Sequence, residues 1–406
     1  MPGTSLIVRT VERNFCGLAL AGILLLSMIR YEKAIVAFCV GFCALFWRAS
    51  RTSFVRHRGL VVASLALLAW IALLTWARDD RTSRILLVQY ASYAALFLAV
   101  IAAMERFGHL AWNARLVLYF LLSLVTLAAV PESILYSDYL RVLQPFGEHG
   151  GRSSSIFNNP NNFGIFMAAG IGWTSSLWLE RIIATRLVLI SCAVFGAQIY
   201  LSGSRNAVAT VAVVSLLVAI ALVRRERSGL AGAEPGRAAG MAAAAVVSIA
   251  VAAVAAAAFA PDDIWGRSVA IPSGIRQVAW SEFARMIVER PLAGTSAAAL
   301  LAGKTVAHGH NLLLTLAAEW GLVGLGLCFW WALRFARAAT WTMARIVAVT
   351  PFLVGQVIDD FHYFRPFGIL AAFVAAWCVS QPQMVAPIVL APRLSEGAPD
   401  ALRTES

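Results

Sequence analysis

Charged residues are scarce in this chain of 406 residues. Only 13% of the residues are Asp, Glu, Lys or Arg, whereas 60% are hydrophobic, and the mean hydropathy is +0.76. A soluble domain has no need for so much apolar sequence, and the apolar runs lack the alternation typical of a membrane β-barrel. These absences exclude a soluble protein and a barrel, and they predict an all-α integral membrane protein.

Other features of common enzyme classes are also missing from the sequence. It contains no nucleotide-binding glycine loop, no sequence repeat and no soluble domain, which argues against ATP as a direct substrate. The cysteines have no metal-ligand spacing and lie within apolar runs, which predicts buried thiols without disulfides. They are Cys16, Cys39, Cys43, Cys192, Cys328 and Cys378. The first apolar run lacks a cleavage-site pattern, which predicts a spanning helix and not a removed signal peptide.

The net charge of +12 comes from 33 Lys and Arg residues, nearly all of them Arg. In a soluble protein this excess would suggest a nucleic-acid partner. Here the basic residues lie mostly in short loops between apolar runs, which is the positive-inside pattern of membrane proteins. We therefore expect membrane lipids as partners and no nucleic acid.

About twelve transmembrane helices are predicted from the apolar runs, in a single multispan domain over residues 1–380. A polar tail at 381–406 is expected in the cytoplasm. The run at 34–47 is short for a full crossing and is the weakest of the set. The predicted spans are 15–30, 34–47, 59–77, 85–104, 112–130, 163–180, 183–201, 206–223, 238–260, 311–333, 342–358 and 366–380.

Arginine-rich short loops predict the orientation in the membrane. The loops that contain Arg48 to Arg58, Arg181 and Arg186, Arg224 to Arg237, and Arg334 to Arg345 hold most of the basic residues, so we expect them in the cytoplasm. The two longest loops, 131–162 and 261–310, then face the periplasm. The polar turn around Arg205 and the segment that ends at Arg365 lie on the same side.

Asparagines gather just before one of the apolar runs. An Asn at a helix start commonly caps backbone N–H groups, which is the structural alternative for any one of them. Four in five positions exceed what one cap needs, so we also expect a polar surface for sugar hydroxyls. They are Asn158, Asn159, Asn161 and Asn162.

The tight turn Ser202-Gly203-Ser204-Arg205 places one Arg at the edge of the bilayer. The structural alternative is an Arg that anchors to lipid phosphates. A second unusual Arg lies in a predicted helix from Ser273, a possible N-cap, to a stop at Pro291. There Arg276 falls on the same helix face as Trp280, Phe283 and Ile287, which predicts either a snorkelling side chain or a cation aimed into a site.

The long second loop ends in His308-Gly309-His310-Asn311, followed by Glu319-Trp320-Gly321 inside the next apolar run. Histidine has a pKa of about 6.5 when unperturbed and is the usual general base near neutral pH. His310 is preferred over His308 as a base because it lies at the mouth of the span. The structural alternative is a His that caps the helix.

Taken together, these stretches resemble the O-antigen ligase and O-antigen polymerase superfamily of bacterial envelope enzymes. The resemblance covers about residues 150–335 in motif detail, and the whole chain in topology and length. Where family members commonly have Gly-x-Gly after the proline, this chain has Gly294-Thr295-Ser296, which concerns loop geometry more than chemistry. The matching pieces are Phe157-Asn158-Asn159-Pro160-Asn161, Ser202-Gly203-Ser204-Arg205, Arg276 with Trp280 and Pro291-Leu292-Ala293-Gly294, and His310-Asn311 with Leu314, Glu319, Gly321, Leu322, Val323 and Gly324.

The resemblance implies a metal-independent glycosyltransferase without a cofactor, with a GT-C-like fold and a long periplasmic loop that carries short helices. It implies an active site on the periplasmic face of the bacterial inner membrane. The donor would be an O-antigen glycan on undecaprenyl pyrophosphate. The acceptor would be a sugar of lipid A–core in the ligase branch, or another lipid-linked repeat unit in the polymerase branch.

The expected chemistry assigns roles to these residues. Arg205 and Arg276 would bind the pyrophosphate, because planar guanidinium groups match phosphate oxygens, and His310 would be the general base. Acidic pairs at 79–80, 262–263 and 359–360 could hold a metal, but such pairs are more often helix caps or salt-bridge partners. The residues expected to bind substrate are Arg152, Asn158, Asn159, Asn161, Asn162, Trp280, His308, Asn311 and Arg365.

The sequence favours a ligase over a polymerase, because of the His-Gly-His-Asn form and the short outer loops. A transporter or flippase for lipid-linked glycans is the alternative from another class. Several charged residues at mid-membrane depth would favour transport, whereas these spans are nearly charge-free apart from Glu319.

Overall fold

The computed structural model describes residues 32–45, 47–107, 119, 122–123, 160–227, 273–295, 311–358 and 365–380. Within these ranges the chain is helical apart from short turns, and they contain no strand. The all-α class predicted from the apolar runs is therefore confirmed for this part of the chain.

The helices agree well with the predicted spans. Nine of the twelve spans coincide with a helix in the structure, namely α2, α4, α5, α7, α8, α9, α14, α15 and α16. The spans at 15–30, 112–130 and 238–260 lie outside the described residues, except for positions 119, 122 and 123. The bounds are α2 Glu32–Leu45, α3 Trp47–Arg56, α4 Arg58–Arg78, α5 Arg81–Phe107, α7 Pro160–Leu179, α8 Thr185–Ser202, α9 Arg205–Arg227, α12 Ser273–Glu289, α14 Leu312–Ala338, α15 Met343–Ile358 and α16 Arg365–Val379.

Five described helices, α4, α5, α8, α9 and α14, are long and apolar enough to cross a membrane. The bent pair α2 and α3 makes a sixth span if its two helices are counted together. The protein is therefore a multi-pass membrane protein, as predicted, while the full number of twelve spans stays a prediction.

Residues 48–58 were predicted to be a cytoplasmic loop between two spans, and the structure shows that this connection is largely helical. Most of the segment forms α3, which bends away from α2 by 98°. Ser50 and Ser53 of α3 are buried, whereas Arg51 and Arg56 are exposed. The serines of α3 lie on the face that packs against α5, whereas Arg51 and Arg56 lie on the exposed face, so an arginine-rich segment can form a packed helix.

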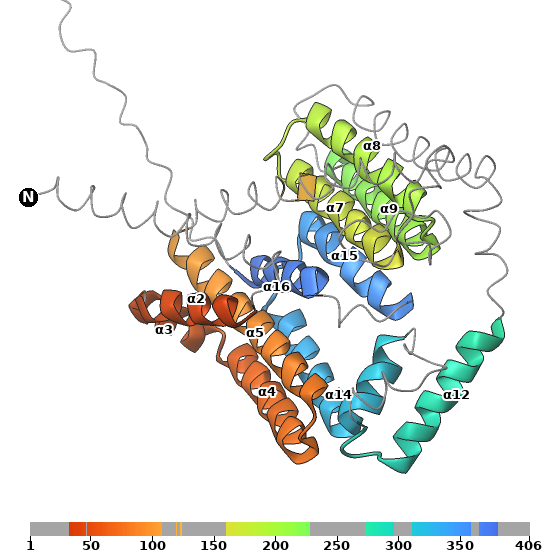
Figure 1. The fold of residues 1–406 in the computed structure, drawn as a ribbon. Coiled ribbons are helices and arrows are strands. Elements are labelled where there is room, and N and C mark those ends of the chain that lie inside the picture. Colours follow the sequence, from red (N-terminus) through yellow and green to blue (C-terminus); the bar gives the residue numbers. More distant parts are fainter. Residues whose placement is uncertain are drawn as a thin grey trace, which may run out of the picture.

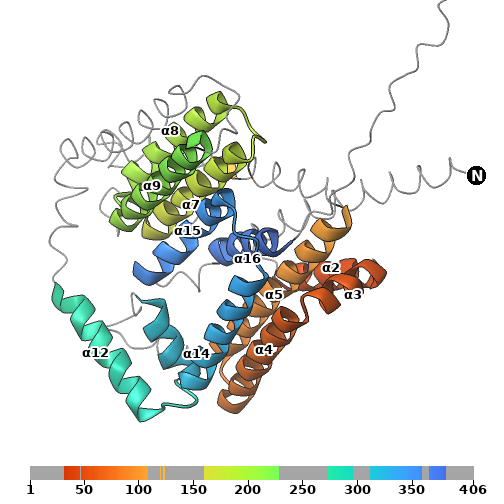
Figure 2. The same cartoon turned by 180° about the vertical axis from the view of Figure 1, so that it is seen from behind.

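Two groups of helices lie on either side of α16. One group contains α7, α8, α9 and α15, and the other contains α2 to α5 and α14 (Figures 1 and 2). The short helix α16 packs against α5 of one group and α15 of the other. α12 lies at the edge of the molecule alongside α14 (Figure 1).

α7 is surrounded by protein on all sides. Sixteen of its 20 residues are buried, and it contacts α8, α9 and α15. Gly172 lets Pro351 of α15 approach closely, since a Cβ at this position would lie 2.7 Å from Pro351 Cγ. Trp173 packs edge-on against Phe373 and Trp377 of α16, at centroid distances of 5.6 and 5.2 Å.

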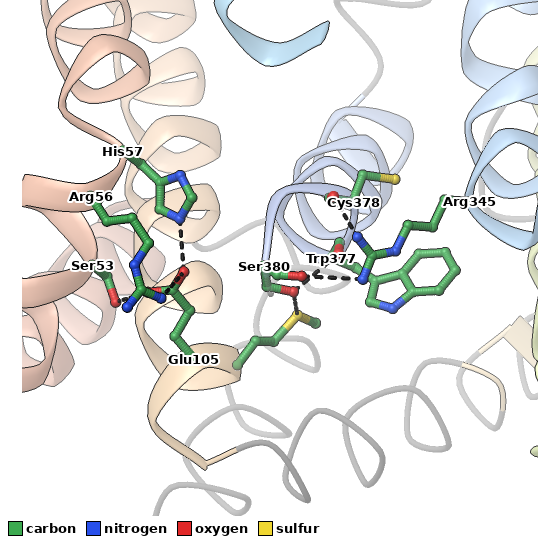
Figure 3. A network of polar contacts seen from close by, with 9 residues as sticks. Ser53, Arg56, His57, Glu105, Arg345, Trp377, Cys378 and Ser380 are labelled. Atoms are coloured by element: carbon green, nitrogen blue, oxygen red, sulfur yellow. Dashed lines mark hydrogen bonds and ion pairs between the residues drawn. The ribbon is translucent and has the colours of Figure 1, made fainter. Parts of the chain in front are cut away.

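At one end of the helices, buried Glu105 of α5 joins α3 and α4 (Figure 3). Its carboxylate accepts a hydrogen bond from Ser53 Oγ at 2.7 Å and lies 2.8 Å from His57 Nε2. Arg56 Nη1 is 3.2 Å from the same carboxylate. Three side chains from α3 and the α3–α4 junction therefore share one acidic partner.

The same end contains a second set of polar contacts (Figure 3). Arg345 of α15 donates to the carbonyls of Cys378 at 2.7 Å and Ser380 at 3.1 Å, and so binds the end of α16. Ser380 Oγ in turn donates to Met104 Sδ at 3.2 Å, beside Glu105. The loop arginines predict that these helix ends lie on one side of the membrane, and in the structure the ends contact one another.

Candidate active site

The structure describes seven of the twelve predicted site residues. Arg205, Asn161, Asn162, Trp280 and Asn311 are described with their side chains. Arg276 and Arg365 are described only as positions in α12 and as the first residue of α16. The predictions for Arg152, Asn158, Asn159, His308 and His310 lie outside the described residues.

The turn between α8 and α9 is held by its own serines. Gly203 has a φ of 58°, the left-handed conformation that ends α8, and its N–H donates to the Tyr200 carbonyl at 2.9 Å. Ser202 Oγ accepts from the Ser204 N–H at 3.2 Å. Ser204 Oγ accepts from the Ala207 N–H at 3.3 Å and thereby caps α9. This arrangement makes Arg205 the first residue of α9.

The first turn of α7 packs directly onto this turn. A Cβ on Gly164 would lie 2.5 Å from Ser204 Cβ and 2.6 Å from Ser202 Oγ, so the approach requires glycine. Asn161 and Asn162 belong to the same turn of α7 and are half-buried. The Asn-rich stretch and the Ser-Gly-Ser-Arg turn, 40 residues apart in the sequence, are therefore one structural unit.

Arg205 is exposed at the start of α9. Its guanidinium makes no ion pair or hydrogen bond with any residue that the structure describes. The N-terminus of α9 adds a partial positive charge at the same place. An exposed arginine at a helix start is suited to binding an anionic group such as a phosphate.

α12 packs one face against the first part of α14. Phe283 and Ala279 are each 1% exposed, and Met286 and Ile287 pack against the same contact with Ala318. Arg276 lies three residues before Ala279 and seven before Phe283, so its position is on this packed face. The predicted apolar stripe is confirmed for Phe283 and Ile287.

Two details of α12 deserve comparison with the prediction. Trp280 was expected in the apolar stripe but is 42% exposed, because Ala279 takes the buried position one residue earlier. The opposite face is polar as predicted: Arg285 lies 2.5 Å from Glu282 and 3.5 Å from Glu289. The hydrogen bond that Arg285 donates to Glu282, followed by the charges of both carboxylates, raises the pKa of Arg285 above its usual value.

Asn311 is the N-cap of α14. Its Oδ1 accepts from the N–H groups of Leu313 at 3.0 Å and Leu314 at 3.2 Å. Asn311 was predicted to bind substrate, and its side-chain oxygen here has a capping role. The N-cap position of α14 is therefore occupied by Asn311, and His310 itself lies outside the described residues.

α14 is broken at Gly321, which has φ 70° and ψ −179°. Three consecutive carbonyls before the break accept hydrogen bonds from outside the helix. Ala318 O accepts from Thr295 N at 2.6 Å, Glu319 O from Arg78 Nη2 at 2.8 Å, and Trp320 O from Trp70 Nε1 at 3.0 Å. Backbone polar groups that a helix break frees in an apolar environment need hydrogen-bond partners. Each of the three carbonyls at this break has one.

The loop that follows α12 covers the break. Leu322, just past it, donates its N–H to the Pro291 carbonyl at 2.7 Å. Gly294 has a φ of 68°, and a Cβ there would lie 2.6 Å from Gly321 N. A Cβ on Gly321 would collide with the Leu292 carbonyl. The Pro-Leu-Ala-Gly and Glu-Trp-Gly motifs therefore meet backbone to backbone, and both glycines are required by space as well as by conformation.

Sequence reasoning missed Arg78 and Trp70, which come from α4 and bind the break. Nothing in their local sequence points to α14, since Arg78 is 241 residues from Glu319. The one available signal was the Glu-Trp-Gly sequence inside an apolar run, because glycine favours a helix break. A broken helix needs hydrogen-bond donors from outside the helix.

The acidic pair Asp79-Asp80 has a structural role. Asp80 Oδ1 accepts from the Ser83 N–H at 2.7 Å and Oδ2 from Ser83 Oγ at 2.6 Å, which caps α5. Asp79 forms an ion pair with Arg84. No group of three or more His, Cys, Asp or Glu that could hold a metal occurs among the described residues. The pairs at 262–263 and 359–360 lie outside them.

Comparison with known proteins gives a match to a protein family. Residues 187–329 match the family model described as O-antigen ligase. The matched segment runs from α8 into α14, and it includes the turn before Arg205, all of α12 and the break at Gly321. No curated protein matches the chain.

Proposed function

Because residues 187–329 place this chain in the O-antigen ligase superfamily, as its motifs predicted, we propose that it is an O-antigen ligase. It transfers a glycan from undecaprenyl pyrophosphate to a sugar hydroxyl of lipid A–core. The reaction takes place on the periplasmic face of the inner membrane, and it uses no metal.

The observation that carries this proposal is the environment of Arg205. An exposed guanidinium without an acidic partner among the described residues stands at a helix N-terminus, beside a turn of α7 that contains Asn161 and Asn162. A pyrophosphate needs cations, and the sugar attached to it needs hydrogen-bonding amides. The cation of Arg205 and the amides of Asn161 and Asn162 occur together, where the first turn of α7 packs onto the turn between α8 and α9.

The proposed mechanism is a displacement at the anomeric carbon of the donor. The acceptor hydroxyl attacks this carbon, the bond from the carbon to the pyrophosphate oxygen breaks, and undecaprenyl pyrophosphate leaves. His310 takes the proton of the attacking hydroxyl. Arg205 and Arg276 stabilise the negative charge that develops on the leaving oxygen, which is the role that a metal has in other transferases.

The position of Arg276 supports its part in this mechanism. It lies on the face of α12 that packs against the first part of α14, and His310 immediately precedes the cap of that same part. A phosphate-binding residue on α12 and a base at the start of α14 can therefore act on one donor.

A strain that lacks the gene tests the proposed function. We expect its lipid A–core to carry neither polymer nor a single repeat, while polymer accumulates on the carrier lipid. A core that carries one repeat would instead identify a polymerase. A lipid-linked repeat confined to the cytoplasmic leaflet would identify a flippase.

Purified variants test the assigned residues. His310→Ala should lose roughly 10²–10⁴-fold in transfer rate and keep its affinity for the donor. Arg276→Lys and Arg205→Lys should lose both rate and affinity, because lysine keeps the charge but not the planar fork. Arg285→Lys, on the opposite face of α12, is the matched control and should resemble the wild type.

Two outcomes would change the assignment. An active His310→Ala with an inactive His308→Ala would move the base to His308. Complete loss of transfer in excess chelator, restored by Mg²⁺ or Mn²⁺, would move the chemistry to the acidic pairs.

A further inference from the structure

Arg78 is the last residue of α4, and it binds two segments of the candidate site at once. Its Nη2 donates to the carbonyl of Ala293 at 2.5 Å and to the carbonyl of Glu319 at 2.8 Å. Ala293 belongs to the loop after α12, and Glu319 lies two residues before the break in α14. One nitrogen with two N–H groups therefore binds both segments.

We propose that Arg78 is a positioning residue for glycan transfer. It fixes α12 and the first part of α14, residues 312–320, in one relative placement. This inference rests on the proposed function, because it concerns how Arg276 and His310 are held toward a common donor. Arg78 itself contacts no substrate in this proposal.

The surrounding contacts show why a side chain from α4 is needed. The two direct bonds between loop and break, from Thr295 to Ala318 and from Leu322 to Pro291, join these segments to each other. They do not join them to the rest of the protein. The first part of α14 is joined to α4 by the packing of Leu316 and Trp320 against Ile71 and Leu74 and by Trp70, which donates to the Trp320 carbonyl at 3.0 Å. Arg78 adds a bond from α4 to the loop as well as to α14. α4 thereby serves as the fixed support for both.

The charge of Arg78 suits this place. The carboxylate of Glu319 is buried in α14 and acts electrostatically on Arg78, together with Asp80. A guanidinium can donate to two carbonyls and remain near a carboxylate without losing its proton. The carbonyls of Ala293 and Glu319 thus have a donor whose charge lies near two carboxylates.

The first experiment measures the placement directly and does not depend on activity. Nitroxide labels are attached in a cysteine-free protein at Val288 of α12 and Leu313 of α14, which are 79% and 48% exposed. Pulsed electron paramagnetic resonance should give one narrow distance in the wild type and a broader distribution in Arg78→Met. Equal, narrow distributions in both proteins would overturn the proposal.

The second experiment measures catalysis and binding separately. Arg78→Met should lower kcat by roughly ten- to hundredfold, the loss that a small misplacement of reacting groups produces, with unchanged affinity for undecaprenyl pyrophosphate. Arg78→Lys should recover part of kcat, since it keeps a donor and the charge. Trp70→Phe should lower kcat by a smaller factor. An equal loss of lipid affinity would show that Arg78 contacts the donor, against the proposal.

Arg84→Met is the matched control, because Arg84 is an exposed arginine at the same end of the bundle that pairs with Asp79 and makes no bond to the break. It should keep the wild-type kcat and the narrow distance. If Arg78→Met fails to fold, Arg78→Lys and Trp70→Phe test the same proposal, with smaller expected changes in distance and kcat. Broadened distances in a protein that transfers no glycan in any form would uphold the positioning role and reject the proposed function.

Discussion

At the scale of single residues, two arginines bind carbonyl groups at the ends of helices. Arg345 donates to the carbonyls of Cys378 and Ser380, where α16 ends, and Arg78 donates to that of Glu319, before the break in α14. A helix end has carbonyls without helical partners and a partial negative charge, so a guanidinium meets both needs. Glu105 differs, because its partners are side chains.

Glu105→Ala should destabilise the protein without changing the chemistry. The substitution leaves Ser53 and His57 buried without their acceptor, and breaking a buried pair costs roughly 3–5 kcal/mol. We expect the lower part of this range, because Arg56 is 43% exposed and can turn to water. The transfer rate per folded molecule should stay at the wild-type value, because α5 has 27 residues and separates Glu105 from the Arg78 end by about 40 Å.

Thermal unfolding in detergent and the transfer rate of the same samples measure both parts of this prediction. Glu282→Ala is the control, since Glu282 pairs with exposed Arg285 on the outer face of α12 and surface pairs contribute little. Similar unfolding midpoints for the two variants would contradict the structural role assigned to Glu105.

At the scale of elements, glycines decide where helices meet. Gly164 lets α7 approach the α8–α9 turn, Gly172 lets Pro351 of α15 approach α7, and Gly294 and Gly321 bring the α12 loop onto the break in α14. In each case an added Cβ would lie within 3 Å of another segment. These contacts bring the sequence motifs together in two pairs.

Gly164→Ala should displace α7 from the turn that presents Arg205. Overpacking of this kind costs typically 1–3 kcal/mol, and transfer should fall because Arg205 moves with the turn. Gly196→Ala on α8 is the matched control, since a Cβ there meets nothing within 4 Å and alanine favours a helix by roughly 0.5–1 kcal/mol. Unfolding midpoints and transfer rates of both variants measure the difference; equal behaviour would mean that the contact at Gly164 is unimportant.

The helices could be predicted from the sequence, whereas their mutual contacts could not. Apolar runs of about 20 residues define spanning helices by their length alone, and the stop at Pro291 and the start at Ser273 follow from local backbone chemistry. The face of α12 was predicted with an error of one residue, at Trp280. The break at Gly321 and its partners were missed, because they depend on donors from α4 that only the packing brings near.

At the scale of the whole molecule, polar contacts gather at the two ends of the helices. Glu105, Arg345 and Ser380 form contacts at one end, and the Arg78 to Gly321 contacts lie at the other. Helix ends predicted to share a side of the membrane are therefore neighbours in space. The sides of the membrane predicted from the loop arginines therefore agree with which helix ends pack together.

Thiol labelling tests which side each end faces. In a cysteine-free protein, Leu292→Cys and Asp79→Cys should react with a membrane-impermeant maleimide added to whole cells, because both positions are exposed at the candidate site. Arg337→Cys should react only after the inner membrane is permeabilised. The reverse pattern would place the site in the cytoplasm and exclude the proposed reaction. Different sides for Leu292 and Asp79 would contradict the packing itself.

During synthesis of the protein, α7 is poorly suited to enter the membrane by itself. It has two asparagines in its first turn and Thr174, Ser175 and Ser176 further along, and it is absent from the described helices that are apolar enough to cross a membrane alone. Two of the three helices that cover it, α8 and α9, are synthesised directly after it. We therefore expect the insertion machinery to retain α7 until both have emerged, so that the three helices enter the lipid as one unit.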